Sequence, residues 1–328
     1  MPSLTRVLDP GTDQRRKTDP LLASIRGFGQ VDLQSNLVTG LAIFAALWVS
    51  GWEVGLFATI GTLASTATAV LLGVPRRHVV FGLYGYCGCL TGIALITSLG
   101  HHGSTYILTV AAAALCAILT ATLTTFFAPY GLTALTAPFC LISGVMVLGA
   151  PSFERVWHGG SRTKLSSATK GGTSLSWNDL WHGFFSNVSQ IFLVDEWYVG
   201  LIMLAGLCVA GWRVGLFAAL GSVVGIFTAW ALGAPSTLVE NGIYGYNAVL
   251  VAIAVGAVKL RADLWGAGYA LFGAAVSTGL TASITNLFKP FGGHTFTWPF
   301  ILTTWMLMAA VPRLARPRLP EPAPQSAG

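Results

Sequence analysis

Charged side chains are scarce in this sequence. Lys, Arg, Asp and Glu make up 9% of its 328 residues, whereas apolar residue types make up 54%. A chain with so few charges lacks the polar surface that a soluble protein of this length needs around its core. We therefore predict an all-α polytopic membrane protein, whose helices cross the bilayer several times.

Residues for metal binding and covalent chemistry are also few. The five cysteines are spaced too irregularly for a disulfide framework, and Cys87 and Cys89 in GYCGCL have no two further metal ligands nearby. No Ser-His-Asp set and no pair of carboxylates recurs within the apolar runs. The sequence therefore predicts no metal, no other cofactor and no enzyme.

Basic residues outnumber acidic ones by 18 to 12, and most of them lie near the ends and in loops. They form no stripe interleaved with aromatic residues, so anionic membrane lipid is the expected partner and nucleic acid is not. The first 36 residues hold five Lys and Arg and no apolar segment typical of a cleaved signal peptide. We expect both termini in the cytoplasm, with 1–29 as a cytoplasmic segment and 313–328 as a disordered tail.

Apolar runs mark the expected spans. Ten runs occur, five on each side of a Gly-, Ser- and Thr-rich connector, at about 37–50, 54–73, 79–99, 105–127, 138–150, 197–210, 214–233, 243–258, 264–288 and 299–312. Several approach the ~20 residues that cross a bilayer, while the first and last of each half are shorter, which is typical of broken or re-entrant segments. We predict a first membrane repeat over 30–150, a connecting loop over 151–186 and a second membrane repeat over 187–312.

The two halves are related in sequence. GWEVGLF at 51–57 returns as GWRVGLF at 211–217, GLYGY at 82–86 returns as GIYGY at 242–246, and LTAPF at 135–139 returns as FTWPF at 296–300. Three matches displaced by 160 or 161 residues indicate an internal duplication. Because five spans per repeat is an odd number, we expect two inverted five-helix repeats around a central pore, with the site near the bilayer midplane.

Polar residues at matched positions are the first candidates for this site. Gln30 and Gln190 each have an amide that can both donate and accept hydrogen bonds. Thr136 and Thr297 stand two residues before a proline, within a run where prolines free backbone carbonyls from helical pairing. Each type also has a structural explanation, as a helix cap or as a hydroxyl bonded to its own helix. Their recurrence in both halves favours a pore.

Aromatic and aliphatic residues at matched positions supply candidate pore walls. Tyr86 with Leu90, and Tyr246 with Leu250, lie four residues apart and so share one helix face. A ladder of neutral acceptors between such walls suits a small, flat, neutral solute that carries N–H donors. Cation channels use acidic rings and anion channels use arginines at depth, and the deep parts of these runs have neither.

The motifs LTALTAPF at 132–139 and GHTFTWPF at 293–300 resemble the duplicated L-P-x-x-T-x-P-F signature of the urea transporter family. The segments GLYGY and GIYGYN are similar to that family too, and the resemblance spans about residues 25–312. It implies a homotrimer in the cell membrane, here the bacterial inner membrane, in which each subunit holds its own pore and urea moves passively down its gradient. A channel for ammonia or another small neutral amide-like solute is the alternative, because His294 lies near one broken segment.

The resemblance also assigns residues to the pore. These are Gln30, Leu33, Tyr86, Leu90, Thr136, Gln190, Ile191, Tyr246, Asn247, Leu250 and Thr297. The glutamines would bind urea at the two mouths, the tyrosines and aliphatic residues would line two slots, and the threonines would line the midpoint. The sequence departs from the signature at its first leucine-proline, because Thr133 and His294 stand where the family has proline.

Overall fold

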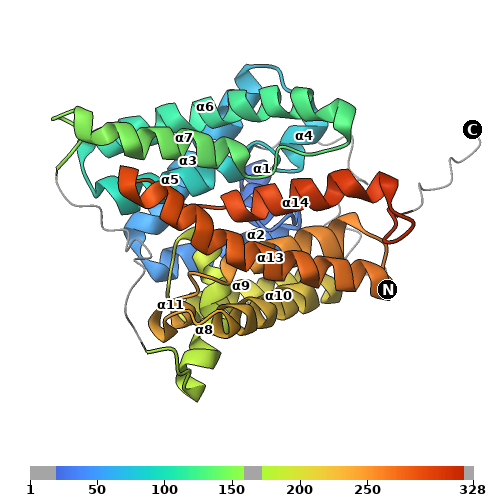
Figure 1. Ribbon diagram of the computed structural model, residues 1–328. Coiled ribbons are helices and arrows are strands. Elements are labelled where there is room, and N and C mark those ends of the chain that lie inside the picture. The colour runs from blue at the N-terminus through green and yellow to red at the C-terminus, as the bar shows by residue number, and fades with distance from the viewer. Residues whose placement is uncertain (1–19, 159–171, 321–328) are drawn as a thin grey trace, which may run out of the picture.

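The computed structural model describes residues 20–158 and 172–320, and every regular element within these ranges is a helix (Figure 1). Four helices are long and apolar enough to cross a membrane, or five if the bent pair Trp177–Phe192 and Trp197–Ala210, which meets at 78°, counts as one span. The prediction of an all-α polytopic membrane protein is confirmed. Those parts of the expected cytoplasmic segment, connecting loop and tail that fall in 1–19, 159–171 and 321–328 lie outside the described residues.

The helices of the first half are α1 (Pro20–Gln30), α2 (Leu37–Ser50), α3 (Trp52–Leu71), α4 (Arg76–Val80), α5 (Tyr86–Leu99), α6 (Gly103–Phe127), η3 (Ala128–Tyr130), α7 (Ala137–Gly149) and η4 (Ala150–Ser152). Those of the second half are α8 (Trp177–Ser189), η5 (Gln190–Phe192), α9 (Trp197–Ala210), α10 (Trp212–Ala231), α11 (Ser236–Glu240), α12 (Tyr246–Val251), the π-helix η6 (Ala252–Lys259), α13 (Leu264–Phe288), η7 (Lys289–Phe291), α14 (Trp298–Ala310) and η8 (Val311–Arg313).

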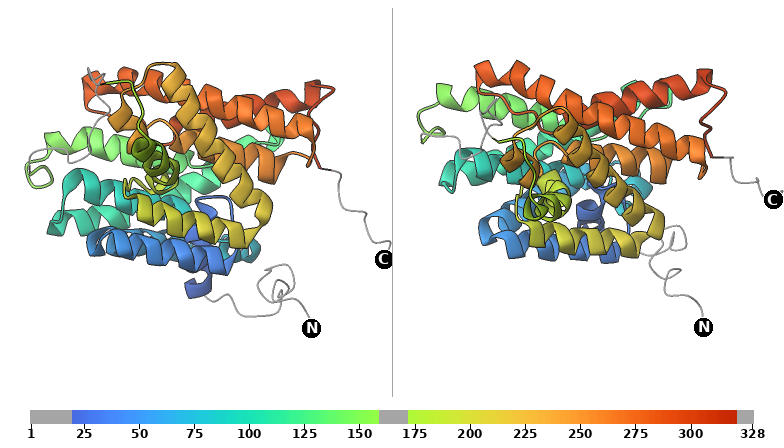
Figure 2. Two further views of the ribbon diagram at one scale, coloured as in Figure 1. Left: turned by 90° about the horizontal axis from the view of Figure 1, so that it is seen from below. Right: turned by 60° about the horizontal axis from the view of Figure 1, so that its bottom comes forward.

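The internal duplication is visible in the order and length of the helices. Helices α2 and α9 both have 14 residues, α3 and α10 have 20, α6 and α13 have 25, and α7 and α14 have 13. The two halves lie against each other, with α2 packed on α9 and α7 on α14 (Figure 2). The Thr39 hydroxyl donates to the carbonyl oxygen of Gly206 at 2.8 Å, which ties α2 to α9.

Helices α1 and α8 lie outside the apolar runs. The described helices begin at Pro20 in the first half and at Trp177 in the second, ten residues before each expected membrane repeat. Both helices are amphipathic, so a search for continuous apolar runs does not reveal them. Each packs closely on the helix that follows, because a Cβ at Gly40 or Gly200 would overlap a carbonyl oxygen of α1 or α8.

The described part of the C-terminal tail has a defined place. Residues 314–320 form no helix, but the backbone N–H of Arg261 donates to the carbonyl oxygen of Arg318 at 3.0 Å. The Arg316 guanidinium lies over the Trp265 ring, 5.4 Å from its centroid. These two contacts place Arg316 and Arg318 beside the start of α13.

Glycines allow α3 and α5 to cross with their backbones in close contact. Added Cβ atoms at Gly61 and Gly88 would each overlap the carbonyl oxygen of the other residue. A Cβ at Gly92 would overlap the carbonyl oxygen of Phe57. Small residues of this kind let membrane helices approach without side chains between them. The contact fixes α5, and with it the position of Tyr86 at its first residue.

The variant Gly92→Ala should therefore be less stable than the wild type. The new Cβ overlaps a backbone atom of α3, and overpacking of this kind costs about 1–3 kcal/mol. Gly144→Ala is the matched control, because a Cβ there has nothing within 4 Å. Thermal unfolding of the purified protein in detergent measures the difference. Equal midpoints for Gly92→Ala, Gly144→Ala and wild type would contradict the described packing of α3 on α5.

Candidate functional site

Two short loops interrupt the apolar part of the chain, one before α7 and one before α14. Each contains a buried residue with left-handed backbone, Leu135 with φ 50° and Phe296 with φ 42°. Such a conformation in a non-glycine residue costs about 1–3 kcal/mol and is concentrated at functional sites. Pro138 and Pro299 follow in the first turn of each helix, where a missing N–H costs no helical hydrogen bond. Both helices therefore begin inside the molecule.

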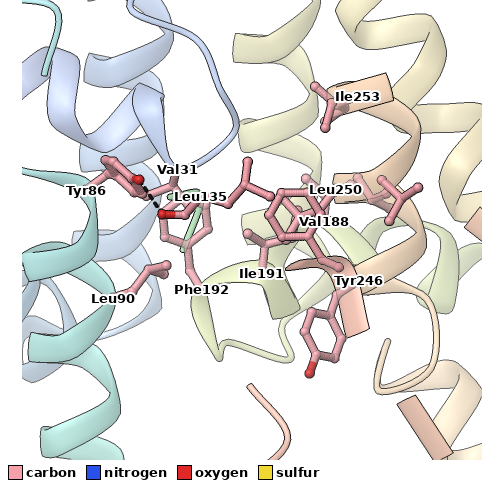
Figure 3. Packing of buried hydrophobic residues seen from close by; sticks show 14 of the residues in the cluster. Val31, Tyr86, Leu90, Leu135, Val188, Ile191, Phe192, Tyr246, Leu250 and Ile253 are labelled. Carbon is pink, nitrogen blue, oxygen red and sulfur yellow. Dashed lines mark hydrogen bonds between the residues drawn. The ribbon is translucent and has the colours of Figure 1, made fainter. Parts of the chain in front are cut away.

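Two buried tyrosines hold these loops. The Tyr86 hydroxyl donates to the carbonyl oxygen of Leu135, and the Tyr246 hydroxyl donates to that of Phe296 (Figure 3 draws the first). Each tyrosine is the first residue of its helix, α5 or α12. A carbonyl in a left-handed turn has no helical partner, so the phenol supplies the hydrogen bond that the backbone cannot. The tyrosines thus fix two carbonyls at matched places.

The next residue after each carbonyl is a threonine, and the two threonines meet. Thr136 Oγ1 and Thr297 Oγ1 are 2.7 Å apart, in hydrogen-bonding contact, and each residue is 2% exposed. The contact joins residues 161 positions apart, at matched places in the two halves. The Cys140 sulfur lies 3.1 Å from Thr297 Oγ1. Protein groups therefore cover both threonines almost completely.

Four helix N-termini gather around the threonine pair. Helices α7 and α14 begin directly after the threonines, and α5 and α12 begin at the tyrosines that bond to the same loops. The first turn of a helix has N–H groups without intrahelical acceptors and a partial positive charge. The site therefore combines neutral oxygen acceptors with positive helix ends, an arrangement that disfavours cations.

The amide of Asn247 supports α14. Its Oδ1 accepts from the backbone N–H of Phe300 at 3.2 Å, and its Nδ2 donates to Thr281 Oγ1 at 3.1 Å. Thr297, the N-cap of α14, makes no capping bond with its side chain, so Asn247 satisfies a donor that a capping threonine usually binds. Asn247 is fully buried, and both ends of its amide bind protein groups.

Aliphatic residues from both halves form one cluster beside the tyrosines (Figure 3). Leu90 and Leu250 lie one turn after the tyrosines and are fully buried, and Val31 and Ile191 pack in the same cluster. Leu33 is half-buried at its edge, in a left-handed turn with φ 61°. The resemblance to the urea transporter family assigned both Leu33 and Ile191 to the slot walls.

The repeat partners of Leu33 and Ile191 pack in the same cluster. The residue with the same turn as Leu33 is Leu193, with φ 59°, and the buried residue that matches Ile191 is Val31. Sequence reasoning missed Val31 and Leu193, although the displacement of 160 residues was sufficient to find both.

The two glutamines lie near opposite ends of α5. Gln30 ends α1, and a Cβ at Gly27 in that helix would lie 3.3 Å from the Cα of Gly85, directly before α5. Gln190 lines a cavity of about 300 Å³ together with Thr97, near the C-terminal end of α5. At about 1.5 Å per residue, the first and last residues of this 14-residue helix are separated by roughly 20 Å. The cavity therefore lies at the Gln190 end of α5.

One buried acid departs from the sequence-based expectation of an uncharged interior. Asp32 is fully buried, and neither carboxyl oxygen has a hydrogen-bond partner among the described residues. The matched position holds Phe192, so the two halves do not build a ring of carboxylates. Sequence reasoning overlooked Asp32 because it falls in a turn before the first apolar run.

Comparison with known proteins decides the family. The model of the family described as "Urea transporter" matches residues 21–312. The chain belongs to the urea transporter family. Urea transporter 1 of Ovis aries is 28% identical to it over 292 residues, which cover 87% of this chain and 75% of the relative. Urea transporter 1 of Rattus norvegicus is 27% identical over 296 residues, with the same coverage.

The urea transporter signature keeps its threonines here but lacks its first proline. In the first half Thr133 stands there, and its carbonyl oxygen accepts from the indole Nε1–H of Trp305 at 2.9 Å. In the second half His294 stands there, with its ring 5.3 Å from that of Phe296. Both substitutes make contacts next to the broken segments.

The tyrosine contacts predict an effect on stability. Tyr246→Phe leaves the carbonyl oxygen of Phe296 buried without its donor, which costs about 1–3 kcal/mol. Tyr130→Phe is the control, because Tyr130 is 68% exposed. Thermal unfolding in detergent should show a lower midpoint for the first variant only. If both variants unfold at the wild-type temperature, Tyr246 does not hold the loop.

Proposed function

We propose that this urea transporter family member moves urea passively through a membrane, along a path from Gln30 past the threonine pair to Gln190. The observation that carries the proposal is the buried contact between Thr136 and Thr297, flanked by two fixed carbonyls. Relatives that bear the name urea transporter 1 support it. Under this proposal the protein binds and releases urea without changing it chemically.

The chemistry of urea fits these groups. Urea has four N–H donors and one carbonyl in a plane, and removing its water without replacement costs several kcal/mol. The threonine oxygens and the carbonyls of Leu135 and Phe296 can accept from the amides. A glutamine amide at each mouth can donate to the carbonyl. Urea thus replaces its hydrogen bonds to water with hydrogen bonds to protein groups.

The walls explain what the path excludes. Leu90 and Leu250 give the flat faces of urea an apolar contact, but they offer nothing to a hydrated ion. The four helix N-termini at the centre oppose a cation. A small neutral planar molecule meets neither barrier. Ammonia, the alternative solute, offers fewer donors to the same acceptors.

Assembly and orientation belong to the same proposal. The positions of Gln30 and Gln190 near opposite ends of α5 support inverted repeats. The family resemblance supports a homotrimer in a cell membrane, in contact with lipid. Native mass spectrometry showing only single chains would contradict the homotrimer. The basic ends support cytoplasmic termini, which places the connector outside.

Transport is tested by stopped-flow measurement of urea entering proteoliposomes. We expect urea flux above that of protein-free liposomes, and we expect it to persist when all ion gradients are dissipated. Methylammonium flux in the same vesicles tests the ammonia alternative. Urea flux that stops when the ion gradients are dissipated would contradict passive movement. Methylammonium flux without urea flux would identify ammonia, not urea, as the transported solute.

Orientation is tested by cysteine labelling. Cys208 is exposed and is first changed to alanine, after which the other four cysteines are buried. A cysteine at the exposed Ser152 should react with an impermeant maleimide added outside intact cells. A cysteine at the exposed Ala315 should react only after the membrane is opened. The reverse pattern would overturn the proposed topology.

A further inference from the structure

The two threonines at the centre of the site do not have equivalent surroundings. Cys140 lies one turn after Thr136 on α7, and its sulfur is 3.1 Å from Thr297 Oγ1 on the opposite half. The residue is 1% exposed, so protein groups cover the contact on almost all sides. The matched position on α14 holds Ile301, which has no polar side-chain atom. The duplication thus provides a thiol beside one hydroxyl and a hydrocarbon side chain beside the other.

The two threonine hydroxyls differ in how many hydrogen-bonding positions remain for a solute. A threonine hydroxyl has one hydrogen to donate and two lone pairs to accept with, three positions in all. Thr297 uses two of them, one with Thr136 and one with Cys140. Among the described residues, Thr136 Oγ1 has Thr297 as its one side-chain partner. Whichever atom donates in each pair, Thr136 keeps two free positions and Thr297 keeps one.

We propose that Cys140 is a positioning residue for urea movement, which holds the Thr297 hydroxyl and so leaves Thr136 as the main oxygen that serves the solute. This inference rests on the proposed function. Thr297 then acts mostly as a support that fixes Thr136 across the two halves. The two halves of the site have the same backbone arrangement, but Thr136 has more unused hydrogen-bonding positions for a solute than Thr297.

The proposal replaces the simple expectation from symmetry, under which Thr136→Val and Thr297→Val would be equally harmful. Valine keeps the shape of threonine and removes the hydroxyl. Thr136→Val should lower urea flux by about 2- to 13-fold, the effect of one lost hydrogen bond at the barrier. Thr297→Val should lower it clearly less, because Thr136 is then released to bind the solute with all three positions.

Substitutions of Cys140 test whether the thiol causes this inequality. Cys140→Ile copies the matched residue and frees Thr297, so the two valine changes should become equally harmful in that background. Cys140→Ser retains a hydrogen-bonding group and should retain the inequality. If Cys140→Ile does not insert into the membrane, Cys140→Ala removes the sulfur with less bulk. Valine changes that are equally harmful in the wild-type background, or an inequality that survives Cys140→Ile and Cys140→Ala, would overturn the proposal.

Infrared spectroscopy tests the contact without any transport assay. The S–H stretching band of Cys140 is isolated as the difference between wild type and Cys140→Ala, and it should shift when Thr297 becomes valine. The band of the exposed Cys208, isolated in the same way, is the control and should not move. An unmoved Cys140 band would contradict the contact. Absent urea flux with a shifted band would instead count against the proposed function alone.

Discussion

Backbone groups in a hydrocarbon environment need hydrogen-bond partners, since each unpaired N–H or C=O costs several kcal/mol there. A helix inside a membrane can therefore begin or end only where the protein supplies the missing partners. In this molecule Tyr86 and Tyr246 supply them to the loops before α7 and α14, and Asn247 supplies one to the first turn of α14. Without these bonds, the left-handed turns that place the threonines would be too costly to persist.

The same constraint explains why a polar site exists at this depth. Carbonyls released from helical pairing are acceptors, and helix starts are donors with partial positive charge. Interrupting four helices at one place produces a neutral but strongly polar centre, with no charged side chain needed. Thr136 and Thr297 complete it by joining the two halves through a single buried contact.

Much of this arrangement follows from the sequence. The ten apolar runs correspond to ten helical segments, and the displacement of 160 or 161 residues marked Thr136 and Thr297 as matched positions. Helices α1 and α8 were missed because their burial depends on one face and on close glycine contacts, neither of which raises average hydropathy. Asp32 was missed because an acidic residue in a turn is normally exposed, and only tertiary packing buries this one.

The asymmetric details needed the structure for a different reason. Cys140 has the sequence context of a small apolar residue inside a helix, yet its sulfur lies beside a hydroxyl of the other half. Contacts between halves depend on how the repeats are packed, and a single sequence does not specify that packing. Likewise, the tyrosines were expected to present their rings to a slot, whereas their hydroxyls bind the strained carbonyls.

The central claim is that the oxygens around Thr136 form the midpoint site for a planar amide. Anomalous diffraction from crystals soaked in selenourea tests it directly, because selenium replaces the carbonyl oxygen while the N–H donors remain. The account predicts an anomalous peak at the centre of the molecule, between Tyr86 and Tyr246 and within a few ångströms of Thr136. Peaks confined to the outer surface or to the cavity at Gln190, with none at the threonine pair, would contradict it.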